Sequence, residues 1–322
     1  MLKYILRKLL LVIPLLIGVV TMVFFLIELS PGDVADKFFT PETTPEVRQQ
    51  IIAKYGLDKP AWYRYLLLLK NLAVLEFGTS IAYGRDVTTL IMEYLPNTLI
   101  LSTVTLLVVY PFGVLLGTIQ GVKQGTIFDT LASVISLFFY SMPSFWLALM
   151  LQLQFSLNWG LLPTSGMHDG VMYDYMSPTE QIFDTLKHII LPGVAMGVAS
   201  AAGAARYMRS SILEVIRQDF VRTARAKGLP EGTVIRKHVI RNALLPIVTL
   251  LGLSLPFLFS GSVLIEIVFA WPGMGRLIVN SIFAQDTPVV IGCFFVFTLM
   301  VVLGNLLADI SYAFVDPRIK YD

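Results

Sequence analysis

Few residues of this sequence have the types and the spacing that catalysis requires. The histidines lie too far apart for a local zinc motif, and no His-Glu-x-x-His sequence occurs; they are His168, His188 and His238. No lysine is followed by Ser or Thr, which excludes the Gly-Lys-Ser/Thr phosphate loop of many ATP-hydrolysing proteins. Cys293 is the only cysteine, so it has no intrachain disulfide partner. The sequence therefore predicts a chain that is not an enzyme and has no catalytic, cofactor-binding or metal site of its own.

The composition is that of a membrane protein. Of the 322 residues, 56% are hydrophobic and only 14% are charged, whereas a soluble protein has about 25% charged residues. A helix needs about 20 mostly apolar residues to cross the hydrocarbon core, where backbone amides cannot stay unpaired. Six uncharged runs can each supply one crossing: 9–27, 94–122, 130–168, 188–205, 242–265 and 287–308. The predicted fold class is an all-α integral membrane protein with six transmembrane helices.

The positive charges predict the orientation of these helices. If residues 1–8, 120–129, 206–241 and 309–322 are cytoplasmic, they hold 15 of the 24 basic residues but only 7 of the 22 acids. Basic residues near helix ends favour the cytoplasmic side, so we expect both termini there. The predicted segments are a first helix kept as a signal anchor (1–30), an external helical segment (31–93), a core with five helices (94–312) and a cytoplasmic tail (313–322).

Charged residues are absent from the interior of the six runs. Glu28, Glu266 and Asp309 stand only at run ends. Ion-driven carriers commonly bury such residues at mid-membrane, which disfavours a secondary carrier, although backbone carbonyls could still coordinate an ion. The net charge of +2 is too small to indicate nucleic-acid binding. A self-sufficient channel or carrier remains the alternative to a subunit of a larger transporter.

The external segment contains two helix signals. Thr43 or Thr44 with Pro45 indicates a helix start, and Gly56 indicates a stop. Residues 62–70 mix aromatic and basic side chains with leucines, as a helix at the membrane interface would. A small helical cap packed on the crossings is equally compatible with this pattern.

The cytoplasmic loop 206–241 is the most informative segment. Its nine cations accompany a helical pattern at Ile212, Val215 and Ile216, so a helix should continue out of the membrane. A short helix at 223–227 should end at Gly228, and a second should begin at Pro230. This predicts a compact projection with Phe220 and Ala224 on one face. The alternative is a basic loop that only touches lipid headgroups.

The crossing at 188–205 is almost without bulky residues, and small residues let helices approach closely. We expect it to be central or to lie at a subunit contact. Its candidate positions for close packing are Gly193, Gly197, Ser200 and Gly203.

Short fragments in a fixed order along nearly the whole chain resemble one family. They are Pro-Gly-Asp at 31–33, Tyr-Gly-Leu-Asp-Lys-Pro at 55–60, Phe-Gly-Thr-Ser at 77–80, Tyr-Ser-Met-Pro at 140–143, Arg-Thr-Ala-Arg-Ala-Lys-Gly at 222–228, Arg-Asn-Ala-Leu-Leu-Pro at 241–246, Trp-Pro-Gly-Met-Gly-Arg at 271–276 and Asp-Pro-Arg at 316–318. Together they resemble ABC-importer permeases of the dipeptide, oligopeptide and nickel branch. Arg222-Thr223 replaces the Glu-Ala of the wider class, and Leu245-Pro246 lies further from Gly228 than the wider pattern has it; both departures look typical of the peptide branch.

The resemblance implies a type I importer permease and a set of partners. These are a second homologous permease, two cytoplasmic ABC ATPases that bind ATP and Mg²⁺, an external or periplasmic substrate-binding protein, and the lipid bilayer. The location implied is a bacterial or archaeal plasma membrane, which is the inner membrane in a Gram-negative cell. The cargo implied is a dipeptide, an oligopeptide, a nickel chelate or a similar small solute.

The resemblance also implies roles for three sets of residues. The loop helix would sit in a cleft of the ATPase and transmit its closure; it comprises Asp219, Phe220, Val221, Arg222, Thr223, Ala224, Arg225, Ala226, Lys227 and Gly228. The turn at 270–276 would contact the binding protein through Trp271, Pro272, Gly273, Gly275 and Arg276. The pathway would run between two permeases, lined partly by Gly193, Gly197, Ser200 and Gly203.

Overall fold

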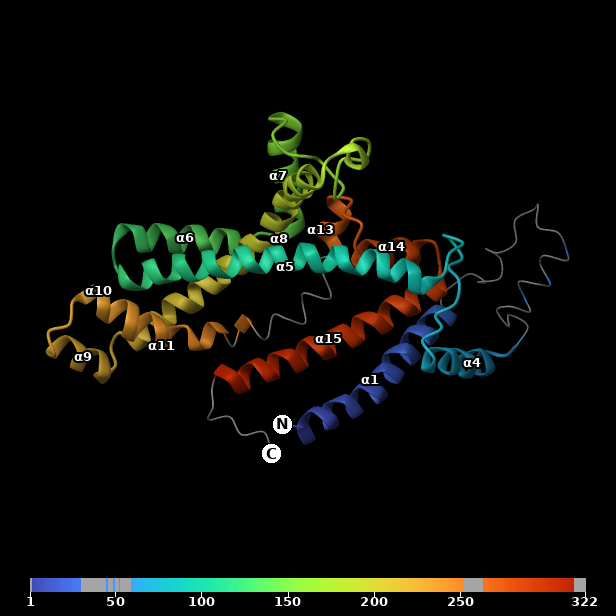
Figure 1. The fold of residues 1–322 in the computed structure, drawn as a ribbon, viewed down its shortest axis with the longest axis horizontal. Coiled ribbons are helices and arrows are strands. Elements are labelled where there is room, and N and C mark those ends of the chain that lie inside the picture. Colours follow the sequence, from blue (N-terminus) through green and yellow to red (C-terminus); the bar gives the residue numbers. More distant parts are fainter. Residues whose placement is uncertain are drawn as a thin grey trace. The chain divides into compact units, whose positions relative to one another are not determined.

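The computed structural model of the chain describes residues 2–29, 45, 49, 52, 59–248, 250–251 and 263–315 (Figure 1). It divides into two compact units. The first is formed by Met1–Pro96 with Leu277–Val302, and the second by Asn97–Arg276 with Leu303–Tyr321. The predicted start and stop of a helix at 43–56 fall largely outside the described residues.

Four helices of the described part are long and apolar enough to cross a membrane. They are α1 (Leu2–Glu28), α5 (Val87–Val122), α8 (Pro178–Val215) and α15 (Thr287–Val315). Both α5 and α8 begin earlier than the uncharged runs at 94 and 188. Half of the expected crossing at 242–265, including residues 252–262, lies outside the described residues, so the count of six stays a prediction.

A fifth span is present if a bent pair of helices counts as one. α6 (Ile127–Ser141) is followed by α7 (Ser144–Leu151) and the π-helix η1 (Gln152–Asn158), with an angle of 101° at the break. The cause is Pro143, because a proline disfavours the helical conformation of the residue before it. Met142 accordingly has φ −82° and ψ 130°. The uncharged run 130–168 is therefore not one straight helix.

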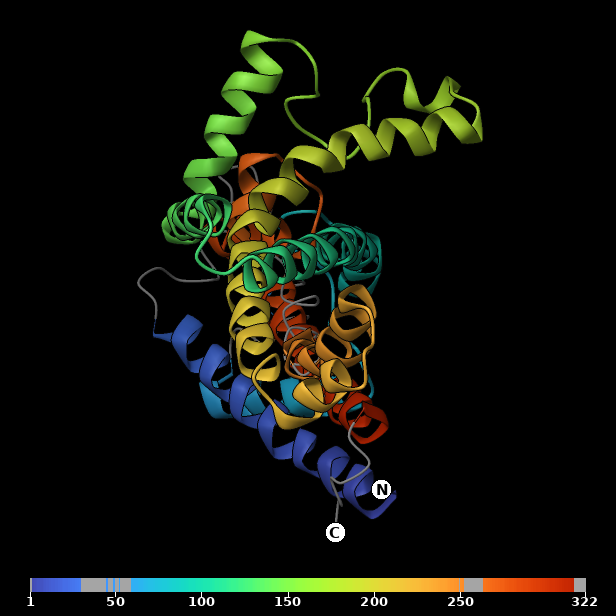
Figure 2. The same cartoon turned by 90° about the vertical axis from the view of Figure 1, so that its left-hand side faces the viewer.

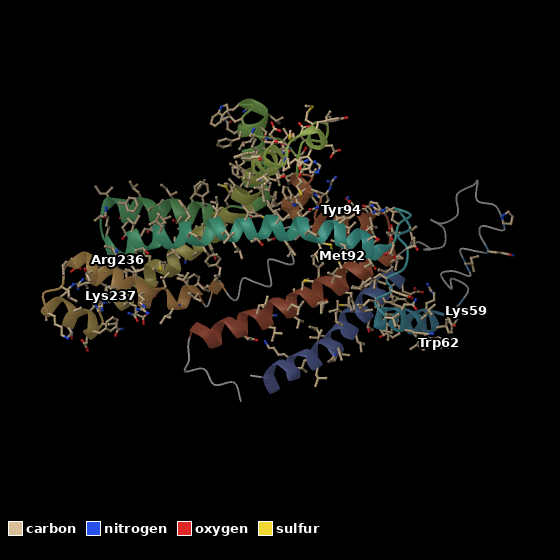
Figure 3. All side chains as sticks on the ribbon, viewed as in Figure 1. Lys59, Trp62, Met92, Tyr94, Arg236 and Lys237 are labelled. Carbon is tan, nitrogen blue, oxygen red and sulfur yellow. The ribbon has the colours of Figure 1, made fainter. Side chains whose placement is uncertain are left out.

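In the first unit, α4 (Ala61–Ala73) packs against α1. Leu72 is buried with Val20, Val23 and Phe24 of α1. Hydroxyl groups of Thr21 and Tyr65 are 2.6 Å apart, and Arg64 pairs with Glu28. The aromatic end of α4 stays exposed, as at Trp62 (Figure 3). The helix thus combines both expected features, with one face packed on a crossing and aromatic side chains on its surface.

In the second unit, α8 is the central helix. It packs against α6 and α7, and short helical segments that follow it in the chain also pack against it (Figure 2). Its N-terminus has a capping box, since Ser177 accepts from the Glu180 amide and the Glu180 side chain accepts from the Ser177 amide. Glycines on α5 allow a close approach of the two backbones: a Cβ on Gly113 would lie 2.7 Å from the Ala201 carbonyl, and one on Gly117 would lie 2.3 Å from that of Ala205.

Candidate functional site

The loop after α8 contains a short helix with clear ends. α9 (Asp219–Ala226) begins after extended Gln218 and has Asp219 in its first turn and Arg225 in its last, which suits the helix dipole. Gly228 ends it with φ +74°, and its amide donates to the Arg225 carbonyl at 2.9 Å. This left-handed conformation suits glycine.

A second helical segment follows and is tied back to α9. It consists of α10 (Glu231–Thr233), η3 (Val234–Ile240) and α11 (Arg241–Ala243). Arg225 donates from Nη2 to Glu231 Oε1 at 2.7 Å and from Nε to Oε2 at 3.1 Å. These bonds lower the pKa of the Glu231 carboxyl. The ion pair closes the turn around Gly228.

Both helical segments share a core with the end of α8. Val221 and Ala224 of α9 are buried in it. Phe220, which the sequence pattern groups with Ala224, is 44% exposed. The core also contains residues of α8, of the second segment and, in Ile247, of the chain just after it: Met208, Ile212, Val234, Val239, Ala243 and Ile247. The loop is therefore a packed extension of α8.

Most of the predicted coupling residues form an open surface on this extension. Val221 and Ala224 face inward. The exposed ones are Asp219, Phe220, Arg222, Thr223, Arg225, Ala226, Lys227 and Gly228. Arg236 and Lys237 on η3 are exposed as well (Figure 3). A partner can reach this basic surface without unfolding the core beneath it.

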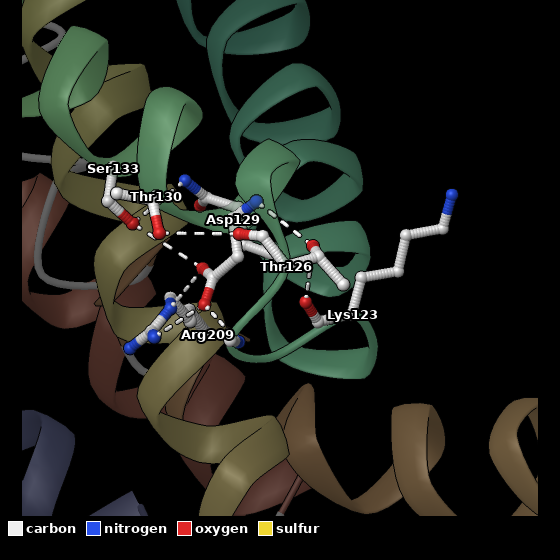
Figure 4. A network of polar contacts seen from close by, with 8 residues as sticks. Lys123, Thr126, Asp129, Thr130, Ser133 and Arg209 are labelled. Carbon is white, nitrogen blue, oxygen red and sulfur yellow. Dashed lines mark hydrogen bonds and ion pairs between the residues drawn. The ribbon is translucent and has the colours of Figure 1, made fainter.

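An ion pair with a buried carboxylate connects α8 to the first turn of α6, next to the loop between α5 and α6 (Figure 4). Arg209 donates from Nε to Asp129 Oδ1 at 2.8 Å and from Nη2 to Oδ2 at 2.9 Å. The amide of Gly125 in this loop donates to the same carboxylate at 3.0 Å. Asp129 is 3% exposed. Since Arg209 follows Met208 of the shared core, the pair ties the loop core to a second helix, a link that the sequence did not suggest.

The effects of mutating Arg209 and Asp129 on the free energy of unfolding should be strongly non-additive. Replacing Arg209 by Gln leaves the Asp129 carboxylate buried without its partner, which costs far more than loss of an exposed pair. A double-mutant cycle of Arg209→Gln and Asp129→Asn, measured by thermal unfolding in detergent, should give an interaction of at least about 1 kcal/mol. The exposed pair Arg222–Asp219, whose side chains are 75% and 96% exposed, is the control and should give no measurable coupling. Equal values for the two cycles would contradict this prediction.

The turn at 270–276 is built around a buried carboxylate. Glu266 in α13 (Val263–Val268) is fully buried and accepts from Thr98 Oγ1 at 2.9 Å and from the Arg276 amide at 3.0 Å. No basic side chain of the described residues forms an ion pair with it. A Cβ on Gly273 would lie 2.5 Å from the Glu266 Cδ. Glycine is thus required there because the carboxylate lies against the backbone.

The predicted contact residues of this turn are mostly inside the fold. Trp271 is fully buried, and its Nε1 donates to the Asn97 carbonyl at 3.0 Å. Gly273 and Gly275 are buried, whereas Pro272 and Arg276 are partly exposed. The binding-protein contact stays a prediction, and only these last two side chains offer accessible surface for it. Glu266 was visible in the sequence only as an acid at the end of an uncharged run.

The small residues of α8 lie in different surroundings. A Cβ on Gly197 would be 2.4 Å from Val109 Cγ2, whereas Ser200 is exposed and Gly203 faces Tyr140. Gly193 and Gly197 also line an apolar cavity of about 530 Å³ between α5, α6 and α8. The close backbone contacts come from Gly113, Gly117 and Gly121 of α5. Their spacing of four residues was a sequence signal for packing.

Comparison with known protein families shows to which family the chain belongs. The profile of the binding-protein-dependent transport system inner membrane component matches residues 110–321, and that of the N-terminal region of such membrane components matches residues 1–102. The chain belongs to this permease family. It is therefore a multi-pass plasma-membrane protein and a transporter subunit.

Relatives and a solved structure agree with this assignment. The permease is 40% identical to the oligopeptide transport system permease AppB of Bacillus subtilis, over the full length of both chains. It is 37% identical to the dipeptide transport system permease DppB of Escherichia coli K12, over 100% of this chain and 99% of that one. An inward-facing structure of the MetNI methionine ABC transporter matches with a TM-score of 0.52 and 19% identity, covering 72% of this chain and 98% of that one. This last likeness supports the type I importer fold.

The described part of the permease contains no group of three or more His, Cys, Asp or Glu side chains placed to hold a metal ion. The candidate functional surface of the permease is the exposed basic surface of α9 and η3.

Proposed function

We propose that this permease forms half of the translocation pathway of an ATP-driven importer for dipeptides or oligopeptides. A second permease supplies the other half, an external binding protein delivers the peptide, and two cytoplasmic ATPases bind ATP and Mg²⁺. The cargo class is suggested by the peptide permeases to which the chain is 37–40% identical. One observation supports the coupling role of the loop: the exposed surface of α9 stands on a core that includes Met208 and Ile212 of α8. Movement of a bound ATPase would then move a membrane helix.

Gly228 provides the test of this coupling role. A Cβ at Gly228 meets no atom within 4 Å, so a substitution acts through the backbone, whose φ of +74° costs other residues about 1–2 kcal/mol. Gly228→Leu should lower ATP-driven peptide uptake at least tenfold while the subunits still assemble. Gly228→Asn is the matched control, since asparagine tolerates this conformation better. Uptake and ATP hydrolysis are measured on the complete transporter in liposomes.

Two results would overturn the proposal. If Gly228→Leu takes up peptide at the wild-type rate, the loop helix does not couple. If the chain purifies alone and transports solute in liposomes without ATP, it is a self-sufficient channel or carrier.

A further inference from the structure

A polar groove lies between α6 and α8, next to the Arg209–Asp129 pair. Its volume is about 610 Å³. Unlike the nearby apolar cavity, it presents two guanidinium groups, two phenols and two hydroxyls: Arg206, Arg209, Tyr140, Tyr207, Ser133 and Ser210. All of these groups can donate a hydrogen bond, so the groove suits an anion.

The positive charge of the groove is only partly neutralised. Asp129 pairs with Arg209 and is buried, whereas the Arg209 side chain is 31% exposed. Arg206 lies over the Tyr140 ring, 5.1 Å from its centroid. Arg206 forms no ion pair with another residue in the described part of the chain. An exposed guanidinium held by an aromatic ring is thus available to a ligand.

Apolar surface borders the groove. Leu137 both lines it and is 53% exposed. Other side chains of α6 are exposed too: Leu131, Val134, Ile135 and Phe138. Arg206 is the first cation after the uncharged run of α8, and the charge distribution of the chain predicts that this end is cytoplasmic. The site therefore offers an anion-binding groove with one apolar lining residue, on a helix whose other faces also expose apolar side chains.

We propose that this groove binds the phosphate headgroup of one anionic phospholipid of the cytoplasmic leaflet. Arg206 binds the phosphate, Arg209 adds a second guanidinium, and the acyl chains lie along the exposed face of α6. Guanidinium groups suit phosphate, and basic pockets between membrane helices bind lipid headgroups. The apolar border favours a lipid over a free anion.

Native mass spectrometry of the full chain, with any subunits that stay bound, tests the assignment. The protein is purified in neutral detergent and titrated with phosphatidylglycerol or phosphatidylcholine. One phosphatidylglycerol should bind at least tenfold more tightly than phosphatidylcholine. Arg206→Gln should weaken that binding about tenfold, and Arg206→Lys should retain most of it. Arg236→Gln, which removes an exposed cation outside the groove, should leave it unchanged.

Three results would overturn the proposal. The first is equal binding of the two lipids, and the second is full phosphatidylglycerol binding by Arg206→Gln. The third is displacement of phosphatidylglycerol by millimolar inorganic phosphate or by a dipeptide, which would assign the groove to a free anion or to cargo. None of these results contradicts ATP-driven peptide uptake, so this test and that of the proposed function fail separately.

Discussion

Replacing Glu266 by alanine should destabilise the permease by about 2–4 kcal/mol, because buried donors lose their acceptor and a cavity forms. Thr98 Oγ1 and the Arg276 amide both donate to this carboxylate, which is fully buried. Thr98 Oγ1 in turn accepts from the Met274 amide at 2.8 Å. The whole turn from Trp271 to Arg276 should therefore loosen.

Thermal unfolding and hydrogen exchange of the purified protein measure this effect. Amide exchange in peptides covering Met274 and Arg276 should become faster in Glu266→Ala. Glu266→Gln should have a smaller effect, since it keeps the shape and one acceptor oxygen. Asp174→Asn is the control, because Asp174 is exposed. Unchanged exchange in the turn of Glu266→Ala would show that the carboxylate does not hold it.

Gly117→Ala should separate α5 from α8. The new Cβ would lie 2.3 Å from the Ala205 carbonyl oxygen and 2.8 Å from Met208 Cβ. Backbone atoms cannot yield as a flexible side chain can, so overpacking should cost about 1–3 kcal/mol. Because Met208 belongs to the loop core, peptide uptake should fall together with thermal stability.

Gly18→Ala on α1 is the matched control. A Cβ there meets no atom within 4 Å, and alanine favours a helix by up to about 1 kcal/mol over glycine. The two substitutions should thus shift the unfolding temperature in opposite directions. A similar shift for both would mean that the close approach of α5 and α8 is unimportant.

The loop could be predicted closely from the sequence because its signals are local. Gly228 and Pro230 end one helix and begin the next, and the structure has α9 and α10 on either side of them. Long apolar stretches likewise predicted α1, α5, α8 and α15 as membrane spans. The break at Pro143 was not predicted, since the uncharged run 130–168 predicts one crossing, and its angle of 101° depends on how α7 packs against α8.

Features that depend on tertiary contacts could not be predicted. Asp129 and Arg209 are 80 residues apart, so nothing in the local sequence pairs them. Trp271 lies in the turn for which the resemblance implies a binding-protein contact; its burial follows from Glu266 and Asn97, which bind the turn from two other helices. Phe220 and Ala224 share a helical spacing, but the core contains Val221 with Ala224 and leaves Phe220 exposed.

The shared core of the loop and α8 has a mechanical consequence. From Val215 back to Pro192, the proline inside the helix, α8 is a lever arm of about 35 Å at 1.5 Å per residue. A rotation of roughly 10° at the loop would move the far end by about 6 Å, more than one turn of an α-helix. The contacts of Gly113 and Gly117 lie along this arm, so α5 would be carried with it. If the loop couples to an ATPase as proposed, a small change of angle there would become a displacement large enough to open or close a passage for a peptide.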